Sequence, residues 1–308
     1  MKMKPHPGYQ CLWDLSAAAS PEDMKNFDTR LQAITNYHPP KGMEIRDFMV
    51  SGAKGAPEVP VRLYRDPAAK NAPLLINIHG GGFVSGSRER DDHRASAFAA
   101  GVPCAVLSVE YRLAPKAIFP AQIEDCLAVV AWAYEHASEI SIDRDRIAVL
   151  GTSAGGAIAA GLCLWLRDKG GPKIRMQVLN YATVDYSVDS LSVHQYYEGA
   201  PLVKGEGFSK VWHLYIGGFD GSVPSYYAVP ALARNLADLP PACVITCEYD
   251  PLRDQGIDYA RRLMECGVPT ELYSLPRVSH GVDLVPAPLT KWIREGICNS
   301  LRREFGML

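Results

Sequence analysis

The pattern of apolar residues changes near residue 74. Before this point, two strand-like runs, Glu44–Val50 and Val59–Arg65, flank the turn-rich sequence Ser51-Gly52-Ala53-Lys54-Gly55 and predict an antiparallel hairpin. From residue 74 onward the strand-like runs are almost continuously apolar, which is typical of strands covered on both faces. The pattern therefore predicts a hairpin that leads into a buried sheet.

Strand-like and helix-like segments alternate through most of the remaining chain. The predicted strands are residues 74–78, 105–111, 146–150, 176–181, 243–247 and 271–275. The predicted helices are residues 87–100, 121–136, 156–167, 255–265 and 289–304. Such alternation predicts an α/β fold with a mostly parallel central sheet and helices on both of its faces.

Two segments stand outside this alternation. In residues 1–40, Ser20 and the following Pro21-Glu22-Asp23 predict a helix start, and residues 24–34 have the spacing of an amphipathic helix. Residues 185–228 hold tyrosines, glycines and serines but no apolar strand, which is typical of a functional insertion such as a lid.

The insertion is rich in aromatic side chains. They are Tyr196, Tyr197, Trp212, Tyr215, Phe219, Tyr226 and Tyr227. We expect most of them to pack the insertion onto the core, and one or two to line a substrate pocket.

Composition excludes several classes of function. The 308 residues fit one large α/β domain, and the net charge of −2 comes from scattered charges with no basic stripe for nucleic acid. No apolar run is long enough to cross a membrane, and no secretory signal is recognisable. The eight cysteines are dispersed, which predicts buried free thiols rather than a zinc site. We therefore expect a cytoplasmic protein with no nucleic-acid or membrane partner.

A candidate nucleophile lies in Gly151-Thr152-Ser153-Ala154-Gly155-Gly156, which contains the pattern G-x-S-x-G. An apolar strand precedes it and an alanine-rich helix follows, which is the context that a nucleophile elbow requires. Ser153 would then stand at a helix N-terminus, where free N–H groups favour developing negative charge.

The sequence His79-Gly80-Gly81-Gly82-Phe83 follows a predicted buried strand and suggests an oxyanion hole. Glycines let backbone N–H groups approach the oxyanion, and we assign the donors to the amides of Gly81, Gly82 and Ala154. We expect His79 to orient this loop rather than to act as the base.

The order of segments nominates the two partners of the serine. His280 lies in Ser279-His280-Gly281, just after the last predicted strand, and is the candidate base. Asp250, beyond the carboxyl end of the strand 243–247, is the candidate acid that holds the imidazole. Glu248 is a weaker alternative, and Asp254 is expected near the start of the next helix, where it suits the helix dipole.

Several motifs in one order support the same interpretation. Besides HGGGF, GTSAGG, EYDPLRD and SHG, the chain contains Glu110-Tyr111-Arg112-Leu113-Ala114-Pro115 and Phe119-Pro120-Ala121. From about residue 40 to its end the chain resembles the hormone-sensitive-lipase-like esterases of the α/β-hydrolase superfamily. That resemblance implies an α/β-hydrolase fold with Ser153, Asp250 and His280 as the catalytic triad.

The resemblance also implies a helical cap formed by residues 1–40 and 185–228. Residues 41–184 and 229–308 would then be the two parts of the core. One departure is Thr152, because many members of the family carry an aspartate before the nucleophile. This departure leaves the three triad residues in place. It is expected to alter the hydrogen bonds on the side of the triad that faces away from the substrate.

The expected activity is hydrolysis of short-chain carboxylic esters by a serine carboxylesterase through an acyl-enzyme, without a metal or organic cofactor. An amidase, lactonase or deacetylase would use the same triad, and a non-catalytic ligand-binding protein would keep the pocket without turnover. The sequence leaves the oligomeric state open, with a homodimer through an outer helix or the edge strand as one alternative.

Overall fold

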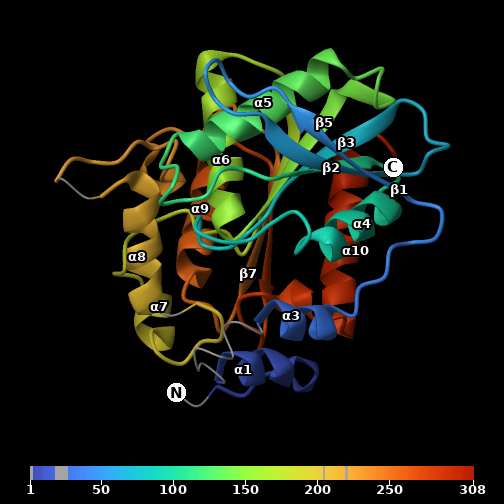
Figure 1. Cartoon of the computed structure of the whole chain (residues 1–308). Coiled ribbons are helices and arrows are strands. Elements are labelled where there is room, and N and C mark those ends of the chain that lie inside the picture. The colour runs from blue at the N-terminus through green and yellow to red at the C-terminus, as the bar shows by residue number, and fades with distance from the viewer. Residues whose placement is uncertain (1–2, 18–26, 204, 219–220) are drawn as a thin grey trace.

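A mixed sheet of eight strands forms the centre of the molecule (Figure 1), whose computed structural model describes residues 3–17, 27–203, 205–218 and 221–308. The strand order is β1-β2-β4-β3-β5-β6-β7-β8. The strands are β1 Glu44–Val50, β2 Val59–Arg65, β3 Ala72–Ile78, β4 Ala105–Val109, β5 Ile142–Thr152, β6 Ile174–Asn180, β7 Ala242–Cys247 and β8 Thr270–Leu275. β1 and β2 pair antiparallel, β2 pairs antiparallel with β4, and all other pairs are parallel, so the predicted mostly parallel sheet is confirmed.

Helices cover both faces of the sheet, as predicted. α5 Ala121–Glu135, α6 Ala154–Lys169 and α9 Arg253–Glu265 lie on one face, and α4 Asp92–Gly101 and α10 Pro288–Glu304 lie on the other (Figure 1). The alternation within β3 shows this directly.

In β3, the side chains of Leu74, Ile76 and Ile78 belong to the apolar cluster that includes α5, α6 and α9. Leu75, between them, belongs to the cluster that includes α4 and α10. All seven residues of β3 are buried, and burying one such aliphatic side chain contributes about 1.5–3 kcal/mol. The continuous apolar run is therefore explained by a strand that packs on both faces.

The predicted hairpin is confirmed with its boundaries, and two other elements start four or more residues away from their predicted positions. The helix predicted from residue 87 begins at Asp92, because residues 88–92 form tight turns in which Asp91 N–H donates to Arg88 O and Asp92 N–H donates to Glu89 O. β5 starts earlier than predicted, at the buried Ile142, and the next four residues, 143–146, are charged and partly or fully exposed. The strand was predicted from its apolar residues, so its charged first part was missed.

The two segments outside the alternation contain short helices. They contain α1 Gln10–Ala17, α3 Phe27–Thr35, α7 Leu191–Tyr196 and α8 Gly205–Ile216. The helix predicted for residues 24–34 corresponds to α3, whereas Ser20, Pro21-Glu22-Asp23 and residues 24–26 lie outside the described residues. The short helix α1 was not predicted.

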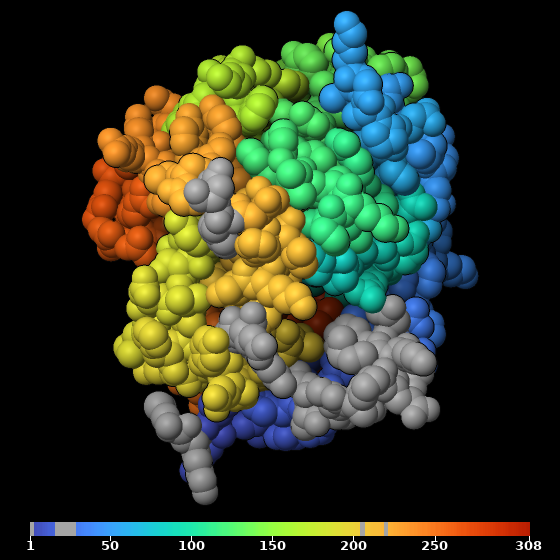
Figure 2. Space-filling model, turned by 60° about the vertical axis from the view of Figure 1, so that its left-hand side comes forward, coloured from blue at the N-terminus to red at the C-terminus, as the bar shows by residue number. Residues whose placement is uncertain are grey.

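These helices gather at one end of the sheet. α1, α3 and α7 lie together at the lower edge in Figure 1, beyond the carboxyl end of β7. In Figure 2 the gold surface of α8 lies beside the green surface of α5 and the segment before it. A hydrogen bond of 2.8 Å from Phe119 N–H to Tyr215 O joins these two parts.

The eight cysteines are free thiols, and six of them are buried. None of the helices in the described part of the chain combines the length and the apolar character needed to cross a membrane.

Candidate active site

The turn between β5 and α6 places Ser153 in a strained backbone conformation. Its φ of 55° and ψ of −118° lie in a region that non-glycine residues rarely adopt. A Cβ on Gly151 would lie 2.1 Å from Gly155 O, and one on Gly155 would lie 2.2 Å from Ile78 O. The two glycines of the motif are therefore required by close backbone packing, and within residues 151–160 only Ser153 is not fully buried.

Ser153, His280 and Asp250 form a continuous hydrogen-bonded line. His280 Nε2 lies 2.9 Å from Ser153 Oγ, and His280 Nδ1 lies 2.8 Å from Asp250 Oδ2. Asp250 and the imidazole are buried, and Leu252 N–H donates to Asp250 Oδ1 at 2.9 Å. Since both carboxylate oxygens have donors, the carboxylate is held in one orientation. This arrangement can remove a proton from the serine hydroxyl.

The other two acids that the sequence offered lie elsewhere. Glu248 accepts a hydrogen bond from Arg277 N–H at 2.7 Å. Asp254 lies in the first turn of α9, as predicted, and accepts from Ser192 N–H at 2.7 Å, which connects α9 to α7. The structure therefore brings only Asp250, of the three, to His280.

The glycine-rich loop after β3 runs beside Ser153. A Cβ on Gly80 would lie 3.2 Å from the Cβ of Ser153. Gly81 and Gly82 have φ values of 122° and 61°, and Ala154 is the first residue of α6. Among the described residues, the amides of Gly81, Gly82 and Ala154 donate no backbone hydrogen bond.

His79 contacts this loop through its ring. Its Nδ1 lies 2.7 Å from Gly80 O, and its ring stacks on Tyr111 with centroids 4.2 Å apart. Tyr111 Oη donates to His79 O at 2.9 Å, so the ring and the backbone of His79 are both fixed. These contacts agree with the expectation that His79 orients the loop.

Residues from the insertion lie directly against both halves of the site. The Cγ1 atom of Val211, on α8, is 3.2 Å from the position that a Cβ on Gly82 would occupy. The Cδ1 atom of Leu202 is 2.6 Å from the corresponding position on Gly281. Sequence analysis did not single out either residue, because an isolated aliphatic residue in an irregular segment carries no positional signal.

Most aromatic residues of the insertion pack on the core, as expected. Trp212 and Tyr215 are buried, and the ring of Tyr215 stacks on Phe83 with centroids 3.9 Å apart. Tyr196 packs on Tyr249 and Tyr227 on Trp165, whereas Tyr226 is exposed and donates to Asp168 at 2.9 Å. Tyr197 is exposed and Phe219 lies outside the described residues.

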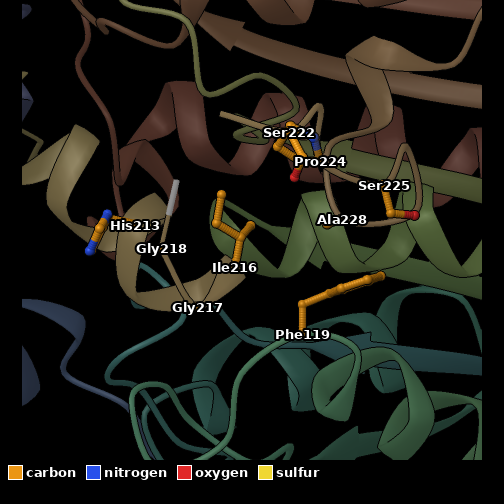
Figure 3. A pocket seen from close by; sticks show the side chains of 9 residues that line it. All are labelled: Phe119, His213, Ile216, Gly217, Gly218, Ser222, Pro224, Ser225 and Ala228. Atoms are coloured by element: carbon orange, nitrogen blue, oxygen red, sulfur yellow. The ribbon is translucent and has the colours of Figure 1, made fainter. Parts of the chain in front are cut away.

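A cavity of about 330 Å³ lies at the end of α8 (Figure 3). Its lining residues are Phe119, His213, Ile216, Gly217, Gly218, Ser222, Pro224, Ser225 and Ala228. Ser153, Asp250 and His280 are not among them, so this cavity is separate from the hydrogen-bonded line.

Comparisons with known proteins agree with this geometry. A family profile described as alpha/beta hydrolase fold matches residues 75–284. The chain is 38% identical over 254 residues to "Esterase LipI" of Mycobacterium tuberculosis, covering 80% of this chain and 78% of the relative. It is 38% identical over 244 residues to "Arylesterase" of Saccharolobus solfataricus, covering 76% and 79%.

Among solved structures, "Bacterial Heroin Esterase" superposes with a TM-score of 0.87 at 36% identity, covering 94% of this chain and 93% of that one. An esterase of Pyrobaculum calidifontis superposes with a TM-score of 0.86 at 31% identity, covering 98% and 99%. With the elbow at Ser153 and the mostly parallel sheet, these matches show that the chain belongs to the hormone-sensitive-lipase-like branch of the alpha/beta hydrolase fold family.

Proposed function

We propose that this protein is a serine carboxylesterase that hydrolyses short-chain carboxylic esters through an acyl-enzyme. The observation that carries the proposal is the hydrogen-bonded line from Asp250 through His280 to Ser153. The names of its relatives, which are esterases and an arylesterase, support the same reaction class.

In the proposed reaction, Ser153 Oγ attacks the ester carbonyl carbon while His280 Nε2 takes the hydroxyl proton. The tetrahedral intermediate then expels the alcohol, to which His280 returns the proton, and the acyl group stays on Ser153. Water attacks the acyl-enzyme with His280 again as base, which releases the carboxylic acid. Asp250 accepts the Nδ1–H bond and stabilises the imidazolium that forms in each half.

We assign the amides of Gly81, Gly82 and Ala154 as the hydrogen-bond donors that stabilise the oxyanion of both tetrahedral intermediates. The positions of these residues support the assignment, because the glycine loop follows β3 and Ala154 follows the nucleophile at the start of α6. Fixed donors of this kind need no reorganisation during the reaction, and loss of one typically costs about 3 kcal/mol in the barrier.

The division into a core and a cap is part of the proposal. Residues 1–40 and 185–228 are assigned to the cap, and residues 41–184 and 229–308 to the core. The positions of Val211 beside Gly82 and of Leu202 beside Gly281 support this assignment, because they place the insertion directly against both loops of the site. A compact cap of this kind favours small esters over long lipids.

The test is hydrolysis of p-nitrophenyl esters from C2 to C16 by the wild-type enzyme and by Ser153→Ala. We expect a maximum at short chains and a loss of kcat of roughly 10⁴-fold or more in the variant, because the nucleophile is removed. Near wild-type turnover by Ser153→Ala contradicts the nucleophile, and a maximum at C10 or longer contradicts the short-chain assignment.

The same triad serves amide, lactone and acetyl substrates. A panel of matched amides, lactones and acetylated amines separates these alternatives from the ester, since each would show a higher kcat/KM for its own substrate. A ligand-binding protein without turnover would hydrolyse none of them.

Two further parts of the proposal concern the cellular location and the oligomeric state of the enzyme. Eight free cysteines support a reducing, cytoplasmic location, which cell fractionation tests. A homodimer through an outer helix or the edge strand is tested by light scattering, with a mass near twice the 33.7 kDa of the chain as the supporting result.

A further inference from the structure

A buried charge cluster lies behind the loop that carries His280. Arg94, on α4, donates from Nε to Asp283 Oδ2 at 2.7 Å and from Nη2 to Asp283 Oδ1 at 3.0 Å. It also donates to Asp91 Oδ1. Arg94 is 3% exposed and Asp91 6% exposed, and the side chain of Asp283 is 14% exposed, so the cluster lies mostly away from solvent.

The charges hold one another in the ionised state. Burial by itself would raise the pKa of Asp283, but the charge and hydrogen bonds of Arg94 outweigh it and hold that pKa below its usual range. Burial would likewise lower the pKa of Arg94, and the charges of Asp283 and Asp91 hold it above its usual value. Asp283 therefore acts as an acceptor on both oxygens.

Asp283 also contacts Asn180 and Tyr181, which touch the backbone of Ser153 and the ring of His280. Asn180 Nδ2 donates to Asp283 Oδ2 at 2.9 Å, and Tyr181 Oη donates to Asp283 Oδ1. On its other side, Asn180 O accepts from Ser153 N–H at 3.0 Å. The ring of Tyr181 packs edge-on against the imidazole of His280, with centroids 4.6 Å apart.

The chain between His280 and Asp283 is short and turned. Gly281 has a left-handed φ of 79°, and Asp283 lies in the 3₁₀ helix η3, Val282–Leu284. A displacement of Asp283 is therefore passed to His280 over three residues. Misplacing a reacting group by about 1 Å can cost on the order of 100-fold in rate, so this anchor bears on the chemistry.

A buried ion pair adds little to stability on balance, because desolvation offsets the attraction between its members. We therefore explain the cluster by its effect on geometry: it holds the chain segments that it joins in one arrangement. We propose that Asp283 is a positioning residue, which holds the loop of His280 in register with Ser153 through Arg94, Asn180 and Tyr181. This role rests on the proposed esterase function.

Asp91 offers a matched control for Asp283. Both of its carboxylate oxygens also accept hydrogen bonds, one from Arg94 and one from Asn77 Nδ2 at 3.1 Å. Replacing either aspartate by asparagine removes one charge from beside Arg94 and places an NH₂ group opposite a donor. Only Asp283 belongs to the chain segment that carries His280.

The experiment compares wild type, Asp283→Asn and Asp91→Asn in kcat and KM for p-nitrophenyl butyrate and in thermal unfolding. We expect Asp283→Asn to lower kcat by about 10- to 100-fold with KM within about twofold, because its effect falls on the reacting geometry. Asp91→Asn should keep kcat within about threefold even if it lowers the unfolding temperature equally.

Equal losses of kcat in the two variants, or a loss in Asp283→Asn confined to KM, would overturn the positioning role. If Asp283→Asn does not fold, Tyr181→Phe decides, since it keeps the ring against His280 and removes the hydroxyl bound to Asp283. We expect kcat to fall about 3- to 10-fold in that variant, and unchanged kcat overturns the proposal. Wild-type enzyme without ester hydrolysis contradicts the proposed function instead.

Discussion

Gly81 has a backbone conformation that side chains rarely tolerate. Its φ is 122°, and a Cβ at this position would lie 2.0 Å from Ser85 O. Ser85 N–H and Ser85 Oγ both donate to Gly81 O, so the loop closes tightly on this residue. Its amide is one of the three that we assign to the oxyanion.

Gly81→Ala should therefore lower kcat by roughly 10²- to 10³-fold, because the loop must shift and its amide leaves the oxyanion. Initial rates on p-nitrophenyl acetate measure this effect. Gly207→Ala is the control, since no atom lies within 4 Å of the added methyl and alanine suits a helix better than glycine. Equal effects of the two substitutions would contradict the assignment of Gly81.

His93 makes stability depend on pH. Burial lowers the pKa of His93 to about 4, and the charge of Arg94 acts in the same direction. In the unfolded chain the histidine takes up its proton near pH 6.5. Between these values the unfolded chain binds more protons than the folded one, so the free energy of unfolding rises with pH. This contribution is lost as pH falls from 6.5 to 4.

His93→Asn should flatten the dependence by up to about 3 kcal/mol between pH 4 and 6.5, because asparagine does not titrate. Its amide can replace the hydrogen bond that His93 Nδ1 makes with Arg90 O at 3.0 Å. Urea unfolding at pH 4.5 and 7 measures the difference. An unchanged slope relative to wild type would show that His93 is not the responsible group.

Local sequence nominated the candidate triad but not the buried residues that contact it. Ser153, Asp250 and His280 each follow a strand, so the order of strands together with the local motifs was enough to nominate them. Arg94 and Asp283 are separated by 189 residues. Arginine and aspartate are also common on solvent-exposed faces, so nothing local distinguishes a buried pair of them.

At the scale of elements, α8 contacts the oxyanion loop through aromatic packing. Phe83, which follows the glycines, lies 5.0 Å from Trp212 and 3.9 Å from Tyr215 between ring centroids. Both residues of α8 are fully buried. The position of α8 over Gly82 therefore depends on these rings.

Trp212→Ala should lower the free energy of unfolding by about 3–5 kcal/mol, because it leaves a large cavity. It should also raise KM, since Val211 no longer holds its place beside Gly82. Denaturant unfolding and steady-state kinetics test both effects. Tyr197→Ala, at an exposed position of the same insertion, should change stability by less than about 0.5 kcal/mol. A loss in Tyr197→Ala as large as in Trp212→Ala would argue against this packing.

Element boundaries were predictable where burial follows a regular period. The bounds of the hairpin β1–β2 were predicted correctly from its apolar pattern, and the buried strand β3 was predicted to within two residues from its continuous apolar run. The start of α4 was not, because Ser87 accepts from Arg90 N–H at 3.4 Å in a tight turn that resembles a helix cap in sequence. Side chains that satisfy a turn and those that start a helix are of the same types.

At the scale of the whole molecule, the parallel sheet brings distant segments to one edge. The carboxyl ends of β3, β5, β7 and β8 precede the glycine loop, Ser153, Asp250 and His280 respectively. Parallel strands end on the same side, so four loops far apart in sequence meet there. This convergence could be predicted from the order of strands and helices alone.

The arrangement of the insertion could not be predicted. Its helices α7 and α8 contact the core through a few residues, such as Ser192 with Asp254 and Trp212 with Phe83. Such contacts have no period in the sequence, and their partners lie in other segments. The shape of the substrate pocket depends on these contacts. The sequence therefore predicts the class of reaction but not which ester is hydrolysed.

The most direct test of the central claim is covalent labelling of the nucleophile by a fluorophosphonate, followed by intact-mass and peptide mass spectrometry. We predict one phosphonyl group per chain, located on the peptide that contains Ser153, with loss of ester hydrolysis in proportion to labelling. The Ser153→Ala variant should stay unlabelled. Labelling at another residue, or full ester hydrolysis by a completely labelled enzyme, would contradict the account.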